Sequence, residues 1–317
     1  MDAVRAAARV CRQVRRTLVK SDTLDKRDHS PVTIADFASQ AIICAMLTTQ
    51  FPDDVVVGEE QTDQLRQADH HDVRATVVEQ VAQTLGDRRA DERQVLDWID
   101  HAGQSDARGS RYWTVDPIDG TKGFLRGGQY AVALALLEEG QVVLGVLGCP
   151  NLNHQRDKGL MVAAVKGFGS RLMSLDSEET AGQAVRVSEI SDSAQARFCE
   201  SVESAHSSHD DAARIAQTLG IHTDPLRMDS QVKYAAVSRG DAHIYLRLPT
   251  GADYRENIWD HAAGMLVVAE AGGQVSDIHG QPLDFSQGLR LEKNTGIVAT
   301  NGRLHESVIE AIATAGI

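Results

Sequence analysis

The stretch Val115-Asp116-Pro117-Ile118-Asp119-Gly120-Thr121-Lys122-Gly123-Phe124 gathers two carboxylates, a backbone carbonyl and a possible helix start. Residues 112–115 have the apolar pattern of a short buried strand, and the proline predicts that this strand stops before it. Asp116 and Asp119 would then lie in the loop at the carboxyl end of the strand, where their oxygens could bind a hard cation. The glycine and threonine that follow would present backbone N–H groups at a helix N-terminus, which favours a phosphate.

Two other acidic positions give this stretch its significance, because an Asp-Pro or Asp-Gly turn is by itself common in any protein. Val57-Gly58-Glu59-Glu60 follows a strand-like run of valines, and Ile258-Trp259-Asp260-His261 opens an apolar helical run. Acidic residues at three strand or helix ends predict a cage of carboxylates that holds a metal ion.

The motifs resemble those of the lithium-sensitive, magnesium-dependent phosphatase superfamily of inositol monophosphatase and fructose-1,6-bisphosphatase. Three blocks carry this resemblance: Gly58-Glu59-Glu60, Asp116-Pro117-Ile118-Asp119-Gly120-Thr121 and Trp259-Asp260-His261-Ala262-Ala263-Gly264. Further segments resemble the family of 3′(2′),5′-bisphosphate nucleotidases within it, namely Ser30-Pro31-Val32-Thr33, Thr121-Lys122-Gly123-Phe124-Leu125-Arg126-Gly127, Gly148-Cys149-Pro150-Asn151-Leu152, His206-Ser207-Ser208-His209-Asp210, Asp229-Ser230-Gln231-Val232-Lys233-Tyr234 and Tyr245-Leu246-Arg247-Leu248-Pro249. The resemblance implies an α/β (α+β) protein, built as a layered α-β-α-β-α sandwich of the inositol monophosphatase type.

The resemblance also implies the catalytic parts. Two or three Mg²⁺ ions would be held by Glu59, Asp116, Asp119, Asp260 and the carbonyl of Ile118. Asp36 with Thr121 would orient and deprotonate the attacking water. Without that resemblance, an aspartate in the first turn of a helix would be read as a partner of the helix dipole.

The motifs that match the nucleotidase family also imply which residues contact the substrate: Gly120, Thr121, His206, Ser230, Lys233, Arg247 and Asp260. The lysine and the arginine suit the phosphate that is not cleaved. His206 and His209 are spaced like a metal-binding pair, but a surface turn is the more common origin of such a spacing. Residues 251–257 carry more charge than the family pattern suggests, which leaves selectivity between bisphosphate and sulfated nucleotides open.

The predicted activity is removal of the 3′-phosphate of adenosine 3′,5′-bisphosphate (PAP) to give AMP, with 3′-phosphoadenylyl sulfate (PAPS) as a second substrate. This activity would clear a by-product of sulfate assimilation. One alternative is an inositol phosphate phosphatase that uses the same metals, which the predicted nucleotide contacts disfavour. Another is a nucleotide-binding regulator without turnover, which the complete set of predicted metal ligands disfavours.

Composition sets wider bounds. The chain has 317 residues, 42% of them hydrophobic, and a net charge of −13, which argues against a general nucleic-acid binder. Four widely spaced cysteines predict reduced thiols and a cytoplasmic protein. No run of 18 apolar residues was found that would indicate a membrane span, and the arginine-rich start has the spacing of a packed helix rather than of a targeting segment. A monomer is the default expectation.

Periodicity predicts the elements and a division into two lobes. Residues 1–180 would form an α+β lobe with the metal-binding loop, and residues 181–317 an α/β lobe with the nucleotide contacts. Helices are expected over 4–19, 34–50 with Thr33 as the cap, 73–85, 91–98, 211–219, 231–239 and 259–271, and at the C-terminus. Strands are expected over 130–137, 142–148, 161–165, 242–248 and 296–300, and 61–109 reads as a mobile helical insertion.

Overall fold

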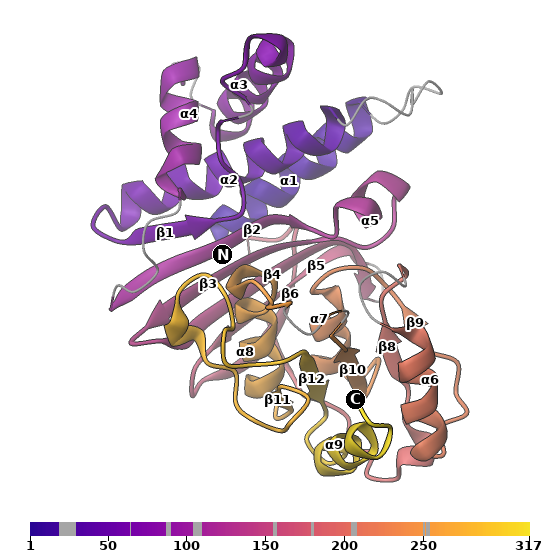
Figure 1. Ribbon diagram of the computed structural model, residues 1–317. Helices are drawn as coiled ribbons and strands as arrows, with labels where there is room; N and C mark the ends of the chain where they lie inside the picture. The colour runs from indigo at the N-terminus through magenta and orange to yellow at the C-terminus, as the bar shows by residue number, and fades with distance from the viewer. Residues whose placement is uncertain are drawn as a thin grey trace.

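Five alternating layers of helices and sheets build the described part of the chain (Figure 1). A computed structural model describes residues 1–18, 30–63, 65–86, 90–103, 110–154, 157–178, 181–203, 208–249, 251 and 254–317. The α-helices are α1 Asp2–Leu18, α2 Ser30–Gln50, α3 His71–Leu85, α4 Glu92–His101, α5 Thr121–Arg126, α6 His209–Thr218, α7 Val232–Ser238, α8 Ala262–Glu270 and α9 His305–Thr314. Short 3-10 turns are η1 Ala68–His70, η2 Ser193–Gln195, η4 Ile258–Asp260 and η5 Phe285–Gln287.

The first sheet contains seven described strands in chain order, from β1 to β7. β1 runs parallel to β2, and every later neighbour pair is antiparallel. The antiparallel arrangement predicted for residues 130–165 is therefore confirmed. The strands are β1 Val55–Gly58, β2 Arg111–Asp119, β3 Ala131–Glu138, β4 Gln141–His154, β5 Asp157–Val165, β6 Gly169–Ser174 and β7 Gln183–Val185.

The second sheet has the described strand order β11-β12-β10-β8-β9. This sheet is mixed, because β10 pairs parallel with β8 but antiparallel with β12. Figure 1 shows α7 and α8 between the two sheets, with α6 and α9 on the far side of the second one. The strands are β8 Phe198–Glu200, β9 Leu226–Arg227, β10 Ile244–Arg247, β11 Gln274–Ser276 and β12 Ile297–Thr300.

Three hydrophobic cores join these layers. Val132, Leu134 and Leu136 of β3 pack with α1 and α2, whereas the residues that alternate with them pack with α7 and α8. This two-residue period places both faces of the strand in protein, as expected of a sheet with helices on either side. The third core lies between the second sheet and the outer helices. The predicted α-β-α-β-α sandwich is confirmed.

Helix α2 is the apolar centre of the first helical layer. Residues Val32–Gln50 are long and apolar enough to cross a membrane by length and composition, but 78% of that window is buried inside the protein. The helices predicted within 61–109 are also present, and Val77, Val81 and Ile99 join the same core. Helices α3 and α4 therefore form part of the first helical layer.

Three predicted element boundaries near the pocket are wrong. The strand did not stop at Pro117, because β2 continues to Asp119 and carries both aspartates on the strand itself. A shift of register between Asp116 and Asp119 creates a bulge, and β1 has already ended, so the missing N–H of the proline breaks no ladder there.

Helix α2 begins at Ser30, so Thr33 lies inside it and does not cap it. Pro31 falls in the first helical turn, where a residue without an N–H is tolerated. The helix expected from Trp259 begins only at Ala262, since Trp259 belongs to the 3-10 turn η4.

Helix α8 packs closely against β4 and α7. A Cβ atom on Gly145 of β4 would lie 2.7 Å from the carbonyl oxygen of Ala263, and one on Gly264 would lie 2.2 Å from the ring of Tyr234. Because only glycine fits at these two positions, α8 can approach both β4 and α7 directly. This approach brings η4, with Asp260, to the carboxyl end of β2.

All four cysteines are buried and free of disulfides. Burial raises the pKa of the Cys44, Cys149 and Cys199 thiols to about 12. They are therefore unreactive packing residues at neutral pH.

Candidate active site

A pocket of about 400 Å³ opens where β1, β2, α5, α7, β10 and η4 meet. Most of the residues singled out from the sequence line it: Glu59, Asp116, Ile118, Asp119, Gly120, Thr121, Ser230, Lys233, Arg247 and Asp260. Asp36 is buried in α2 and is not among the lining residues. His206 lies outside the described residues.

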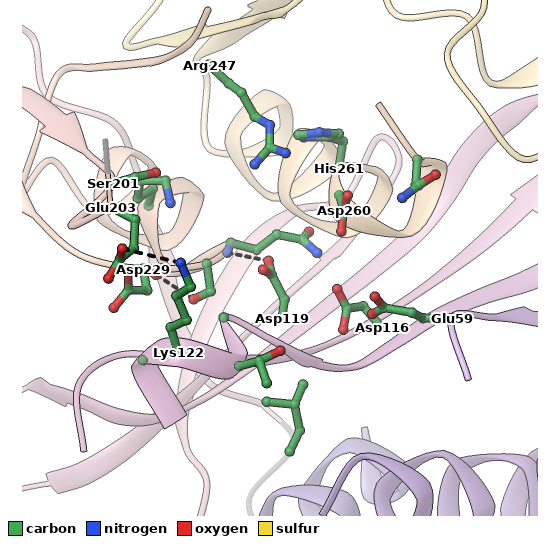
Figure 2. Close-up of a pocket in the computed structure, with 18 of the residues that line it drawn as sticks. Glu59, Asp116, Asp119, Lys122, Ser201, Glu203, Asp229, Arg247, Asp260 and His261 are labelled. Atoms are coloured by element: carbon green, nitrogen blue, oxygen red, sulfur yellow. Dashed lines mark hydrogen bonds and ion pairs between the residues drawn. The ribbon is translucent and has the colours of Figure 1, made fainter. Parts of the chain in front are cut away.

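Three aspartates converge at the centre of the pocket (Figure 2). One carboxylate oxygen from each of Asp116, Asp119 and Asp260 lies within 4.8 Å of the other two. The first two come from the bulged end of β2, and the third comes from the turn before α8. Oxygen ligands from separate elements at this spacing could hold a hard cation such as Mg²⁺.

The protein around Asp116 does not neutralise its carboxylate. Asp116 is buried, and its Oδ1 has no hydrogen-bond partner among the described residues. Burial, followed by the negative charges of Glu59, Asp119 and Asp260, raises the pKa of Asp116 well above its ordinary range. A buried acceptor without a donor is costly, and a bound cation would supply the missing charge. The residues therefore fit a metal site.

Glu59 and Asp260 show the same electrostatic crowding. The surrounding protein and the charges of Glu60 and Asp119 raise the pKa of Glu59 to about 7, although its side chain is partly exposed in the pocket. Burial and the charge of Asp119 raise the pKa of Asp260 to about 7. Without a cation, the cluster would therefore share protons at neutral pH.

Gln231 holds this cluster in place, although the sequence analysis assigned it no role. Its backbone N–H donates to Asp119 Oδ2 at 2.6 Å. Its side-chain amide donates to the Trp259 carbonyl at 2.8 Å and accepts from the N–H of Gly264 at 3.1 Å. One residue thus ties the end of β2 to η4 and α8, and the only sequence signal for it was its place between Ser230 and Lys233.

Glu256 explains the additional charge seen before Asp260 in the sequence. Its two carboxylate oxygens accept from Arg247 Nε at 2.7 Å and pair with His261 Nε2 at 3.1 Å. Burial would raise the pKa of Glu256, but the hydrogen bonds and charges of His261 and Arg247 lower it to about 2. Tyr234 completes the network with a 2.8 Å bond to the other nitrogen of the His261 ring.

This network restricts Arg247 in a way that the sequence did not show. The guanidinium was expected to be available to a substrate phosphate, but its Nε is committed to Glu256 and its Nη2 donates to Tyr254 at 3.2 Å. Arg247 still lines the pocket, and Figure 2 shows its side chain reaching toward it beside His261. It is therefore a positioned cation on the pocket wall.

Lys233 is a buried cation on the same side. Its Nζ donates to the Met228 carbonyl at 3.4 Å and lies 5.1 Å from the centre of the Tyr245 ring. Burial lowers the pKa of Lys233, and the charge of Asp119 opposes that shift. Among the described residues its Nζ forms no direct ion pair with a carboxylate. The ammonium could therefore pair with an anion bound in the pocket.

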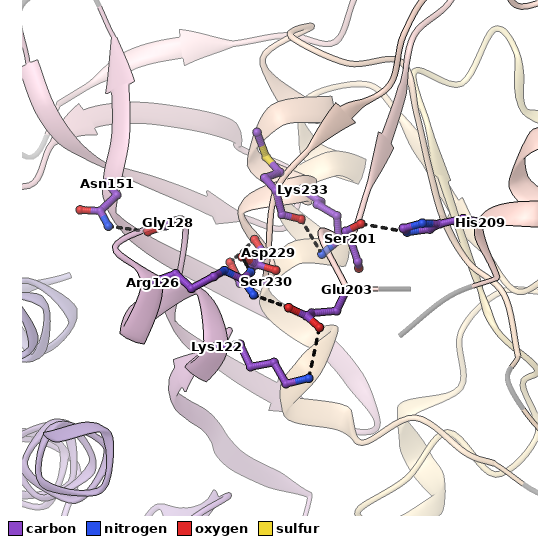
Figure 3. Close-up of polar contacts among 11 residues, drawn as sticks. Lys122, Arg126, Gly128, Asn151, Ser201, Glu203, His209, Asp229, Ser230 and Lys233 are labelled. Carbon is purple, nitrogen blue, oxygen red and sulfur yellow. Dashed lines mark hydrogen bonds and ion pairs between the residues drawn. The ribbon is translucent and has the colours of Figure 1, made fainter. Parts of the chain in front are cut away.

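Charged residues of α5 and the opposite loop form the rim of the pocket (Figure 3). Arg126 pairs with Asp229 at 2.7 Å and also with Glu203, which in turn pairs with Lys122 at 3.3 Å. A Cβ atom on Gly123 would lie 2.0 Å from the Gln129 carbonyl oxygen, so α5 needs glycine there. The next residue after Asp229 is Ser230, whose φ of +68° is unusual for a residue other than glycine.

Asp36 lies behind the cluster rather than in the pocket. Burial and then the charges of Glu60 and Glu59 raise its pKa well above its ordinary range. His209 does not support the alternative metal pair, since its Nε2 bonds to the Ser201 carbonyl at 3.1 Å.

Known proteins show which family this site belongs to. Residues 1–316 match the inositol monophosphatase family. The chain belongs to that family. It is 43% identical to a 3′(2′),5′-bisphosphate nucleotidase of Schizosaccharomyces pombe, over 98% of this chain and 93% of that protein. It is 44% identical to the corresponding protein of Emericella nidulans, over 92% and 90%.

Solved structures show that this inositol monophosphatase family member has the family fold. An IMPase of Thermotoga maritima has a TM-score of 0.64 and 20% identity, with 99% of this chain and 95% of that chain covered. SuhB of Mycobacterium tuberculosis has a TM-score of 0.62 and 19% identity, with 99% and 94% covered.

The crowded carboxylates predict how stability depends on pH in this family member. Groups whose pKa is raised by folding favour the folded state while protonated, and that contribution is lost as pH rises through the folded pKa. Because the pKa values of Glu59 and Asp260 are raised from 4.5 and 3.8 to about 7, the metal-free protein should lose stability between about pH 5 and pH 8. Thermal unfolding in a chelator should show the fall, and added Mg²⁺ should offset it.

Asp116→Asn tests the cause of this pH dependence, because it removes one buried charge from the cluster. The fall in unfolding temperature should become shallower in this variant, while Asp53→Asn, at an exposed position, should leave it unchanged. An unfolding temperature that is flat or rising over this range in the metal-free protein would contradict the interpretation.

Proposed function

We propose that this protein is a magnesium-dependent 3′(2′),5′-bisphosphate nucleotidase, which hydrolyses the 3′-phosphate of PAP to give AMP and phosphate. The observation that carries the proposal is the convergence of Asp116, Asp119 and Asp260 in a pocket that also presents the buried cation Lys233. The bisphosphate nucleotidases named above, which match nearly the whole chain, support the substrate class.

The proposed metal ligands are Glu59, Asp116, Asp119, Asp260 and the Ile118 carbonyl. Two or three Mg²⁺ ions, when bound, would stabilise charge on the attacking and leaving oxygens and lower the pKa of bound water. The orphaned Oδ1 of Asp116 and the raised pKa values of the cluster support such a cation. Gln231 holds Asp119 in place through its backbone N–H.

The proposed catalytic residues are Thr121 and Asp36. Thr121 lines the pocket next to Gly120, so its hydroxyl can hold the attacking water by a hydrogen bond. Asp36 lies behind Glu59 and Glu60, and its raised pKa suits a group that takes up a proton.

The proposed substrate contacts are Gly120, Thr121, Ser230, Lys233, Arg247 and Asp260, together with His206 outside the described residues. Lys233 and Arg247 would attract the phosphate that stays on the nucleotide, since both cations face the pocket. PAPS is proposed as a second substrate because it carries the same 3′-phosphate. The role in sulfur metabolism, lithium inhibition, the monomeric state, the cytoplasmic location and the lobe boundary near residue 180 stay predictions.

Phosphate release from PAP and from inositol 1-phosphate, measured with Mg²⁺, tests the substrate claim. PAP should be the better substrate by kcat/KM. Lys233→Met should lower kcat/KM for PAP by about tenfold or more, because a charged contact to the retained phosphate is lost. Hydrolysis of inositol 1-phosphate, which has no second phosphate, should change less.

Lys166→Met is the matched control, since this lysine is exposed and does not line the pocket. A preference for inositol 1-phosphate would keep the metal site but overturn the nucleotide assignment. Tight nucleotide binding without phosphate release would favour a regulator.

A further inference from the structure

A second cavity lies between α1 and residues of β4 and β5. It has a volume of about 430 Å³ and is lined by Arg12, Arg15, Arg16, Tyr130, Pro150, Asn151, Lys158 and Asp176. None of these described residues lines the catalytic pocket. The volume is within the range of small-molecule sites.

The lining is strongly basic in a protein whose net charge is −13. Arg12, Arg15 and Arg16 come from two turns of α1, and Lys158 comes from β5. Asp176 is the one carboxylate among the lining residues, so three positive charges remain in excess. Such a concentration of cations in a concave surface attracts anions despite the overall negative charge.

Arg12 is held in place by the chain itself. Its Nη1 pairs with Asp176 at 2.6 Å, and its Nη2 donates to the Lys158 carbonyl at 3.0 Å and to the Pro150 carbonyl at 3.3 Å. A Cβ atom on Gly159 would lie 1.6 Å from Nη2, so the guanidinium fills the space that this glycine leaves. Arg12 therefore forms a fixed wall of the cavity.

Arg15 is positioned in the same way but lacks an acceptor. A Cβ atom on Gly127 would lie 2.0 Å from its Nη2, which shows that the guanidinium packs directly on that glycine. Its Nε is buried and has no hydrogen-bond partner among the described residues. Arg15 and Arg16 likewise form no ion pair within the described part of the chain, and holding such groups together without an anion is unfavourable.

We propose that this cavity is a second anion site, which binds a phosphate group through Arg15, Arg16 and Lys158. Guanidinium groups offer paired N–H donors that match the oxygens of a phosphate, and an ammonium adds a point charge. The phosphate could belong to the inorganic ion or to a nucleoside monophosphate, and both have the same recognition chemistry. The inference concerns binding alone and does not rest on the proposed catalytic activity.

The test compares phosphate binding by the full-length, Mg²⁺-loaded protein in three forms, using equilibrium dialysis with labelled inorganic phosphate. Arg16→Gln/Lys158→Gln removes two exposed cations from the cavity. Arg9→Gln/Lys166→Gln is the matched control, because Arg9 is exposed on the same helix and Lys166 directly follows the same strand, yet neither lines the cavity. Thermal unfolding verifies that all three forms are folded.

The cavity variant should bind phosphate at this site about tenfold or more weakly, whereas wild type and control should match each other. Binding at the catalytic pocket is common to all three forms and cancels in the comparison. Equal phosphate binding by the cavity variant and the control would overturn the proposal. This result would be expected if a carboxylate of the chain already filled the site.

Repeating the measurement with AMP and with adenosine separates the two sources. Tighter binding of AMP than of phosphate, lost in the cavity variant, would identify a nucleotide site, and equal binding would identify a site for the phosphate group alone. Adenosine lacks the phosphate and should not distinguish the three forms. A difference between cavity variant and control with adenosine would contradict recognition through phosphate.

Discussion

Asp119→Asn is expected to lower kcat/KM for PAP by about 10³-fold or more, because a metal ligand acts on the charge of the transition state. The substitution keeps the size of the side chain but removes one of three carboxylates whose oxygens lie within 4.8 Å of one another. The remaining oxygen would still face the N–H of Gln231, so the fold around β2 should persist. Steady-state phosphate release over a range of Mg²⁺ concentrations measures the effect.

Asp53→Asn, an exposed position, is the control for the loss of one negative charge. Higher Mg²⁺ should partly restore the Asp119→Asn variant, since weaker metal binding is one source of its defect. Wild-type activity with an unchanged Mg²⁺ requirement would show that Asp119 is not a metal ligand.

Thr121→Val is expected to lower kcat by about 10²-fold while changing KM little, because the hydroxyl would act on the attacking water. Valine keeps the branched shape and removes only the hydrogen bond. Thr121→Ser retains the hydroxyl that would hold the attacking water. Its kcat should therefore stay within several-fold of the wild-type value.

The pair of variants separates chemistry from packing. If Thr121→Ser were as impaired as Thr121→Val, the methyl group and the shape of α5 would matter instead of the hydroxyl. Equal kcat for wild type and Thr121→Val would remove this residue from the mechanism. Thr121 is exposed in the pocket, so neither substitution should unfold the protein.

The sequence was sufficient for the layered fold and for most residues that line the pocket, because these depend on local motifs. Asp116 and Asp119 follow an apolar strand pattern and Asp260 precedes an apolar helix, and such ends meet where strands and helices pack together. The apolar run over 130–137 likewise predicted the strand β3, but not that both of its faces are buried.

What the sequence did not show depends on contacts between distant segments. The bond from the Gln231 N–H to Asp119 joins residues 112 positions apart, and no local pattern indicates it. The commitment of Arg247 to Glu256 required the structure, because a charge in a strand looks the same whether it faces a substrate or a buried carboxylate. The continuation of β2 through Pro117 depended on where β1 ends.

The most direct test of the central claim is a crystal structure of the protein with Mn²⁺ and AMP, in which anomalous scattering locates the metal. Mn²⁺ peaks are expected among Glu59, Asp116, Asp119 and Asp260, with the nucleotide beside Lys233 and Arg247. Metal peaks only at other positions, or no nucleotide beside this cluster, would contradict this assignment.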